Sequence, residues 1–189
     1  MEEAPAVGIG LSRQRLILGA GLLALGLLLA AGPVAAHAVG GRDAAFVVAT
    51  RQAAPGPFVY LGAKHMVTGL DHLLFLLGVI FFLHRARDIL LYVTLFSIGH
   101  SLTLLFGVAT GMGLNAWLVD AAIGLSVAYK AFDNMAGFAA FGLPRPDPKL
   151  AVLGFGLGHG AGPATKLLDL GLAPQGLAAN LVSFNPGVE

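Results

Sequence analysis

The sequence predicts an all-α fold: a polytopic integral membrane helical bundle with an N-terminal signal peptide. Three observations lead to this fold class. Hydrophobic residues make up 57% of the chain and charged residues only 11%, whereas a soluble domain usually carries about 25% charged residues. Apolar segments long enough to cross a bilayer recur along the chain. A short basic region followed by an apolar run opens the chain, as in secretory signals.

The signal peptide is expected over residues 1–36. Arg13 and Arg15 form its basic region, and residues 16–31 are an apolar run rich in Leu and Ala. Small residues before Ala36 suit a signal peptidase, so we expect cleavage after Ala36, with Ala38 as a second possible site. The alternative is an uncleaved first membrane helix.

The remaining chain divides into a short lead-in and a transmembrane domain. Residues 37–57 are a mixed segment expected to be a periplasmic lead-in without a core of its own. Residues 58–189 are the expected transmembrane helical domain, because their apolar segments approach or exceed the roughly 20 residues that span a bilayer. The expected segments are 58–83, 89–110, 115–141, 150–171 and a fifth that begins near residue 175.

Basic loops predict the orientation in the inner membrane. Arg85 and Arg87 follow the first segment of the mature chain, and Arg145 and Lys149 follow the third. Two segments separate these loops, so they lie on one side, and the positive-inside rule makes that side cytoplasmic. The mature N-terminus is then periplasmic, where a cleaved signal would leave it.

Composition also excludes several classes of function. The net charge of +1 and the lack of a basic stripe give no sign of a nucleic-acid partner. The chain has no cysteine, which excludes disulfides, thiolate metal sites and cysteine nucleophiles. No nucleotide-binding motif is present.

The first segment of the mature chain carries the densest set of polar side chains, with His65, Asp71 and His72 within it. Ionisable groups in a bilayer are costly, so each is a candidate functional residue. On a straight helix His65 and His72 lie roughly 10 Å apart along the axis, too far to share one ion. Either the helix distorts at Gly69, or the two histidines serve successive positions on a path. Asp71 is either a ligand or a group that orients an imidazole.

Two later segments each place one histidine near the middle of the bilayer. His100 lies between serines at helical spacing, of which Ser101 is a secondary candidate, although such hydroxyls commonly bond backbone carbonyls. His159 lies in a glycine-rich run whose two small-residue rows favour close helix packing. We expect His72, His100 and His159 at similar depth and His65 nearer the periplasm.

Further polar residues are secondary candidates. Asp120 is expected near the periplasmic end of the third segment, whereas Lys130 and Asp133 are placed to pair on one helix. Pro186 and Gly187 are expected to break the last segment, and broken membrane helices usually line a site. The remaining secondary candidates are Asn134, Asn185 and Glu189.

These motifs resemble the HupE/UreJ family of bacterial membrane proteins over nearly all the mature chain. Two departures stand out: Asp120 occupies a position where the family often has Glu, and the family usually continues beyond the point at which this chain ends. The chain is therefore expected to be a fragment or a short member. The matching features are the signal peptide, His65-x5-Asp71-His72, the stretch from Phe96 to Ser101, the run from Phe155 to Gly160, and the terminal element from Phe184 to Glu189.

The resemblance implies a nickel or cobalt permease, of the kind linked to hydrogenase and urease operons. We expect no enzymatic activity and no tightly bound cofactor, with Ni²⁺ or Co²⁺ as the transported ion. Expected partners are the lipid bilayer and the ion, with a homo-oligomer or a partner membrane protein possible. The expected metal ligands are His65, Asp71, His72, His100 and His159.

Two other functions stay open. One is an intramembrane zinc hydrolase, in which His72, His100 and His159 hold a single Zn²⁺ that activates water. A hydrolase needs these histidines around one metal position, whereas a permease needs them spread along a path. The other alternative is an accessory protein for metalloenzyme assembly that carries no substrate.

Overall fold

The computed structural model describes residues 21, 42–170 and 176–188, which fold into helices with no strand among them. Apart from Gly21, the expected signal peptide with its cleavage site lies outside these residues, and so does Glu189. The helices are α2 (Arg42–Ala49), α3 (Pro55–Thr68), α4 (Leu70–Ile80), α5 (Ala86–Thr110), α6 (Ala116–Asn134), α7 (Gly137–Ala140), α8 (Pro148–Asp169) and α9 (Leu177–Val188). The predicted all-α class is confirmed.

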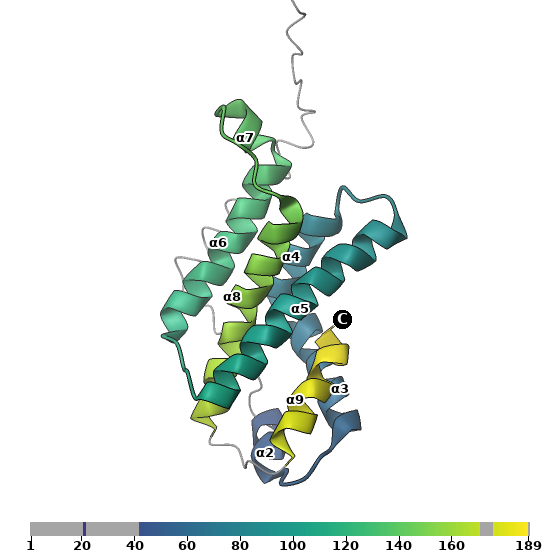
Figure 1. Cartoon of the computed structure of the whole chain (residues 1–189), viewed down its shortest axis with the longest axis vertical. Helices are drawn as coiled ribbons and strands as arrows, with labels where there is room; N and C mark the ends of the chain where they lie inside the picture. The colour runs from purple at the N-terminus through teal and green to yellow at the C-terminus, as the bar shows by residue number, and fades with distance from the viewer. Residues whose placement is uncertain (1–20, 22–41, 171–175, 189) are drawn as a thin grey trace, which may run out of the picture.

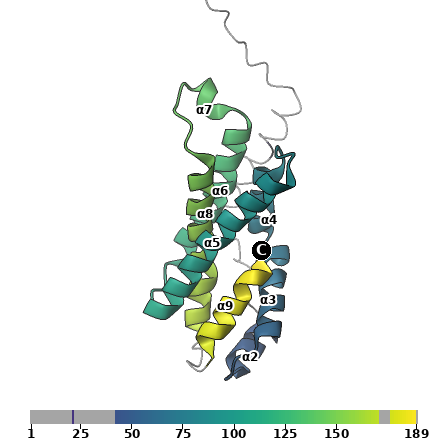
Figure 2. The ribbon, with the colours of Figure 1, turned by 45° about the vertical axis from the view of Figure 1, so that its right-hand side comes forward.

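The helices form an elongated bundle with two parts. In one part α4, α5, α6 and α8 lie together, and α5 crosses α8 at an angle (Figures 1 and 2). In the other part α3 and α9 run side by side, with α2 beside their lower ends (Figures 1 and 2). The most extensive helix contacts are those of α5 with α8 and of α3 with α9.

The first expected membrane segment is broken in two. Helix α3 ends at Thr68, Gly69 adopts an extended conformation with ψ 95°, and α4 starts at Leu70 with its axis turned by 74°. Gly69 still donates its backbone N–H to the His65 carbonyl at 2.9 Å, which caps α3. The break therefore lies between the two histidines of this segment.

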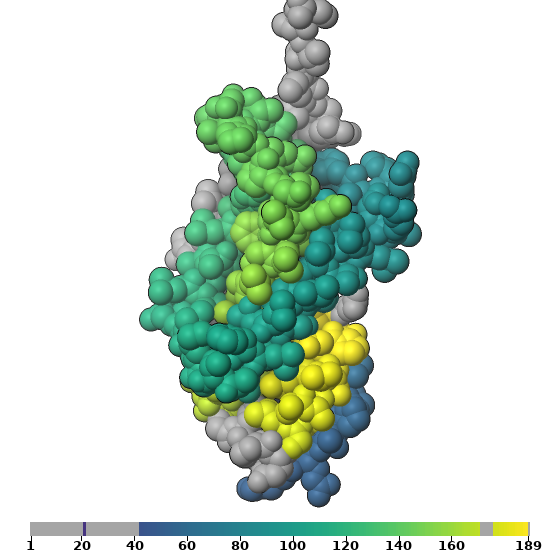
Figure 3. Space-filling view, viewed as in Figure 1, coloured from purple at the N-terminus to yellow at the C-terminus, as the bar shows by residue number. Residues whose placement is uncertain are grey.

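Glycines allow α5 and α8 to approach with their backbones in contact. A Cβ added to Gly156 would collide with the carbonyl of Phe96, and one added to Gly160 would collide with the carbonyl of His100. One predicted small-residue row, Gly156 and Gly160, is thus confirmed as a packing surface. The other row behaves differently, since Gly154 and Gly158 have no neighbour within 4 Å that an added Cβ would meet. In the space-filling view of Figure 3, α5 lies across the face of the molecule that is turned toward the viewer.

Helix α9 corrects one expectation, because Pro186 and Gly187 do not break it. The helix continues to Val188, and Gly187 packs so closely on α3 that an added Cβ would collide with the Val59 carbonyl. Proline lacks an N–H and weakens the helix only locally, so tertiary packing can carry the helix through it. In the same way, α8 runs continuously through Pro163.

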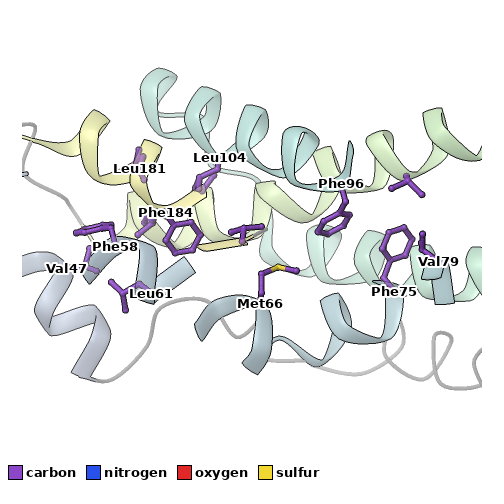
Figure 4. Close-up of a cluster of buried hydrophobic side chains, with 14 of the residues drawn as sticks. Val47, Phe58, Leu61, Met66, Phe75, Val79, Phe96, Leu104, Leu181 and Phe184 are labelled. Atoms are coloured by element: carbon purple, nitrogen blue, oxygen red, sulfur yellow. The ribbon is translucent and has the colours of Figure 1, made fainter. Parts of the chain in front are cut away.

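The lead-in packs against the bundle instead of standing apart. Val47 of α2 joins the buried apolar cluster around Phe58, Leu181 and Phe184, most of which Figure 4 labels. The Asn180 side chain fixes the connection to α3, since it accepts a hydrogen bond from Ala54 N at 2.7 Å and donates one to the Gln52 carbonyl at 3.0 Å. The lead-in therefore closes one end of the α3–α9 pair.

The described helices only partly match the expected membrane segments. Helix α5 is long and apolar enough to cross a bilayer, and the bent pair α3–α4 passes the same test if it is counted as one span. Helix α9 has 12 residues, about 18 Å at 1.5 Å per residue, which is shorter than the hydrocarbon core. Charged residues lower the apolarity of α6, and glycines lower that of α8.

The two basic loops lie at the same end of the bundle, where α4 passes to α5 and α7 passes to α8 (Figure 1). Asp133 holds this end together. It accepts hydrogen bonds from Lys130 Nζ at 2.7 Å and from Arg145 Nε and Nη2 at 2.6 and 2.9 Å. The predicted pairing of Lys130 with Asp133 is confirmed, and Arg145 adds a bidentate partner.

The α5–α8 contact yields a testable prediction. Gly160→Ala adds a methyl group against the His100 backbone and should destabilise the fold by about 1–3 kcal/mol through overpacking. Gly158→Ala is the matched control, because it lies on the same helix in open space and alanine favours a helix by about 1 kcal/mol over glycine. Thermal unfolding in detergent, followed by circular dichroism, should separate the two variants. Equal midpoints would show that the helices do not pack this way.

Candidate metal centre

Four histidines and one aspartate are buried in the middle of the bundle. His65 is 6% exposed, His72 3%, His100 0% and His159 1%, while Asp71 is 6% exposed. They come from α3, α4, α5 and α8. Residues of this type are rarely buried without hydrogen bonds or ligands, so the cluster requires a specific explanation.

Three of the imidazoles converge on one position. One ring nitrogen from each of His65, His72 and His100 lies within 4.8 Å of the other two. Imidazole nitrogens that share a tetrahedral metal ion at about 2.0–2.1 Å lie roughly 3.4 Å apart. The nitrogens therefore need to approach one another by up to about 1.4 Å to hold an ion, a shift that side-chain torsions can supply.

The helix break at Gly69 creates this convergence. The rings of His65 and His72 are 4.8 Å apart between centroids, about half the spacing that a straight helix would impose. Of the two arrangements that the sequence left open, the structure shows the first, in which the helix distorts at Gly69. His65 accordingly lies within the central cluster and not at a separate outer position.

Asp71 lies where it can orient His72, one of the two roles that the sequence allowed. Its Oδ1 lies 3.1 Å from His72 Nδ1, and a hydrogen bond donated by Nδ1–H to this carboxylate leaves the lone pair of the ring on Nε2. Gly69 makes room for this pair, since a Cβ there would lie 2.6 Å from His72 Nδ1 and 3.2 Å from Asp71 Oδ1. A carboxylate behind a metal-binding histidine is the usual way to fix its tautomer and raise its basicity.

Several imidazole nitrogens have no hydrogen-bond partner among the described residues. They are Nε2 of His72, both ring nitrogens of His100, and Nε2 of His159. His159 Nδ1 is satisfied, because it lies 2.8 Å from the Phe155 carbonyl. An unsatisfied buried polar group costs about 1–3 kcal/mol, so the cluster is an expensive arrangement for a purely structural core.

His159 extends the cluster beyond the three convergent histidines. Its ring centroid lies 4.9 Å from that of His72, whereas the ring of His72 also contacts His65 and His100. His72 thus lies between His65 and His100 on one side and His159 on the other. A small movement of its ring would let it bind a metal ion together with either neighbour set. The arrangement is a three-imidazole position with a fourth imidazole alongside.

The secondary polar candidates are not among the convergent ligand groups. Asp120 lines a separate cavity of about 50 Å³ with Lys166 and Asp169, between α6 and α8. The Asn134 side chain donates to the Gly78 carbonyl at 2.8 Å, which ties α6 to α4. Ser101 is half-buried on α5, and Asn185 Oδ1 is buried on α9 without a hydrogen-bond partner in the described part of the chain.

Sequence analysis missed the aromatic residues that border the histidines. Phe75 packs on both Phe96 and Phe155. Phe75 and Phe96, which are fully buried, also contact the His159 ring. The signal was present in the spacing, because each phenylalanine lies three or four residues from a buried histidine of its own helix and therefore shares its face.

Metal binding by the purified protein tests the cluster. We expect Co²⁺ to bind with the visible absorption of a nitrogen-ligated site, and His100→Ala to abolish the binding because it removes one of three convergent nitrogens. Asp71→Asn should weaken binding by about 10–100-fold, the usual effect of losing a carboxylate behind a ligand. His84→Ala is the control, since His84 lies outside the cluster. Equal affinity in all four proteins would exclude this site.

Comparison with known proteins supports the resemblance seen in the motifs. A family model described as HupE / UreJ protein matches residues 41–189, which include every helix named above. No curated protein and no solved structure matches the chain. The matched range covers most of the chain and contains the whole buried cluster, and the chain therefore belongs to the HupE/UreJ family.

Proposed function

We propose that this protein is an inner-membrane permease for a divalent transition metal ion, Ni²⁺ or Co²⁺, which passes through the buried histidine cluster. Membership of the HupE/UreJ family suggests nickel- or cobalt-related metal handling. The observation that carries the proposal is the convergence of His65, His72 and His100 at the break between α3 and α4. Broken helices at membrane depth are a recurrent way to build an ion site.

Exposed apolar side chains support the membrane location. Monomeric soluble proteins rarely expose large contiguous apolar surfaces, and here the exposed side chains occur on all the longer helices. A bilayer would cover them and would also accept α6 and α8, which fall short of the apolarity expected of an isolated span. Helix α8 packs against α5, and α6 packs against α4 and α8. Examples of the exposed side chains are Tyr60, Leu77, Ile98, Leu102, Phe106, Trp117, Leu118, Leu125, Leu150 and Leu157.

The ligand set suits transient binding of a borderline metal. Neutral imidazole binds Ni²⁺, Co²⁺, Cu²⁺ and Zn²⁺ well, and the chain offers no thiolate for softer ions. Asp71 supplies one negative charge next to the position that a dication would occupy, which lowers the cost of its charge in a low-dielectric interior. Three imidazoles leave a coordination position open, so His159 can enter as another ligand leaves.

The zinc hydrolase remains a second candidate because the histidines converge instead of forming a well-spaced path. Three imidazoles with an open fourth position also describe a catalytic zinc site. The trio that shares a position is His65, His72 and His100, whereas the hydrolase hypothesis required His72, His100 and His159. Asp71 is engaged by His72, which leaves it poorly placed as a general base. Peptidase activity of the zinc-loaded protein, lost in His65→Ala, would favour the hydrolase.

Metal uptake in cells tests the permease. His72→Ala should abolish uptake of radioactive nickel or cobalt, because it removes the imidazole whose ring contacts those of the other three buried histidines. The variant protein should still insert into the membrane. Asp71→Asn should reduce uptake severely without abolishing it, since an amide still accepts a hydrogen bond from His72. His84→Ala is the control, because His84 is exposed and lies outside the cluster, and this variant should have much less effect.

All variants are compared at matched amounts of protein in the membrane. Uptake by His72→Ala and Asp71→Asn at the rate of the unmodified protein would contradict the permease. Binding of Co²⁺ by the purified protein without uptake in cells would instead indicate the accessory function.

A further inference from the structure

The buried histidines lie in a layered arrangement that repeats on three helices. His72 of α4, His100 of α5 and His159 of α8 each have a phenylalanine three or four residues away on the same face. In every case the phenylalanine is displaced toward the end of the bundle that carries the basic loops. One helical turn is 5.4 Å, so Phe75, Phe96 and Phe155 form an aromatic layer about one turn from the histidines.

Phe75 joins the other two rings of the aromatic layer. The ring centroids of Phe75 and Phe96 are 5.5 Å apart, as are those of Phe75 and Phe155. Phe75 also contacts the His159 ring at 5.4 Å between centroids. Figure 4 shows Phe75 and Phe96 facing each other across the space between α4 and α5. Phe75 and Phe96 are both 0% exposed and Phe155 is half-buried, so the rings fill the space between α4, α5 and α8.

A half-open cavity of about 580 Å³ lies on the other side of the layer. Its lining includes Val79, Tyr92 and Val152, which lie one further turn along the same three helices. It also includes Asp133 with its partners Lys130 and Arg145. A second, very small cavity of about 10 Å³ adjoins the first, because both are lined by Lys130, Asp133 and Val152. Phe75 and Phe155 line this small cavity. Phe75 therefore contacts the His159 ring on one side and borders the small cavity on the other.

We propose that the cavity is the vestibule through which the ion leaves or reaches the histidine cluster, and that Phe75 is the gate between them. This inference rests on the proposed function. Phe75 lies on α4 three residues after His72, so a movement of α4 about the break at Gly69 would displace ligand and gate together. Helix α4 packs mainly on α6 and only lightly on α3 and α5, whereas α5 and α8 pack extensively on each other. Helix α4 is therefore held less firmly than α5 and α8.

The chain has no cysteine, so one introduced thiol can report whether the gate is open. Ser97 suits this purpose, because it is 5% exposed, its hydroxyl has no hydrogen-bond partner in the described structure, and it lies one turn from His100 on the same face of α5. Serine to cysteine is a small change. The probe is sulfonatoethyl methanethiosulfonate, whose negative charge suits a vestibule with Lys130 and Arg145 against one carboxylate.

The reagent is added separately to spheroplasts and to inverted membrane vesicles. Ser97→Cys alone should be protected on both sides. Ser97→Cys with Phe75→Ala should react about tenfold faster or more, and only from the side of the basic loops. Ser97→Cys with Phe82→Ala is the matched control, because Phe82 lines the vestibule but lies outside the aromatic layer. Protection that persists in the Phe75→Ala protein, or equal exposure in the Phe82→Ala protein, would overturn the gate.

Co²⁺ binding by each double variant shows whether the cluster is intact. If Phe75→Ala unfolds the protein, Phe75→Leu replaces it, because leucine keeps an apolar side chain while removing the ring, and the same two outcomes apply. The thiol reaction needs no transport, so the gate can be tested even if uptake fails. If the thiol becomes exposed in the Phe75→Ala protein but no protein takes up metal, the gate stands and the permease is rejected. If the cells take up metal but the thiol stays protected in every variant, the permease stands and the gate is rejected.

Discussion

The break between α3 and α4 is the feature on which the rest of the structure depends. A straight helix would hold His65 and His72 roughly 10 Å apart along its axis, and no single ion could contact both. The 74° bend at Gly69 brings their rings to 4.8 Å. The absence of a side chain at Gly69 also leaves space for Asp71 to bond His72. One residue without a Cβ thus determines which histidines meet and which nitrogen of His72 faces them.

A second constraint comes from the contact of α5 with α8. Gly156 and Gly160 lie against the backbone of Phe96 and His100, at matching intervals of four residues on the two helices. This register places the His159 ring beside that of Phe96. The layers of histidine and phenylalanine follow from it, because each pair repeats at one helical turn on its own helix. The packing that stabilises the bundle therefore also sets the depth of the chemical groups.

Much of this organisation could be predicted from sequence. Hydrophobic runs predict most helices, and the cost of burying His and Asp singles out the cluster. The 74° bend could not be predicted, because glycine permits a break without requiring one. The continuity of α9 through Pro186 depends on its packing against Val59, which no local signal reveals. Asp133 illustrates the same limit, since Lys130 at helical spacing was foreseeable whereas Arg145 reaches it from a loop.

The central claim is that imidazoles of different helices bind one transition metal ion. X-ray absorption spectroscopy of the purified, cobalt-loaded protein tests it most directly, because imidazole gives a characteristic outer-shell scattering pattern. About three imidazole nitrogens are expected near 2.0–2.1 Å from the metal. The His65→Ala protein should show fewer, because the bend at Gly69 is what brings the His65 side chain to the others. A shell of oxygen ligands alone, or a spectrum unchanged by His65→Ala, would contradict it.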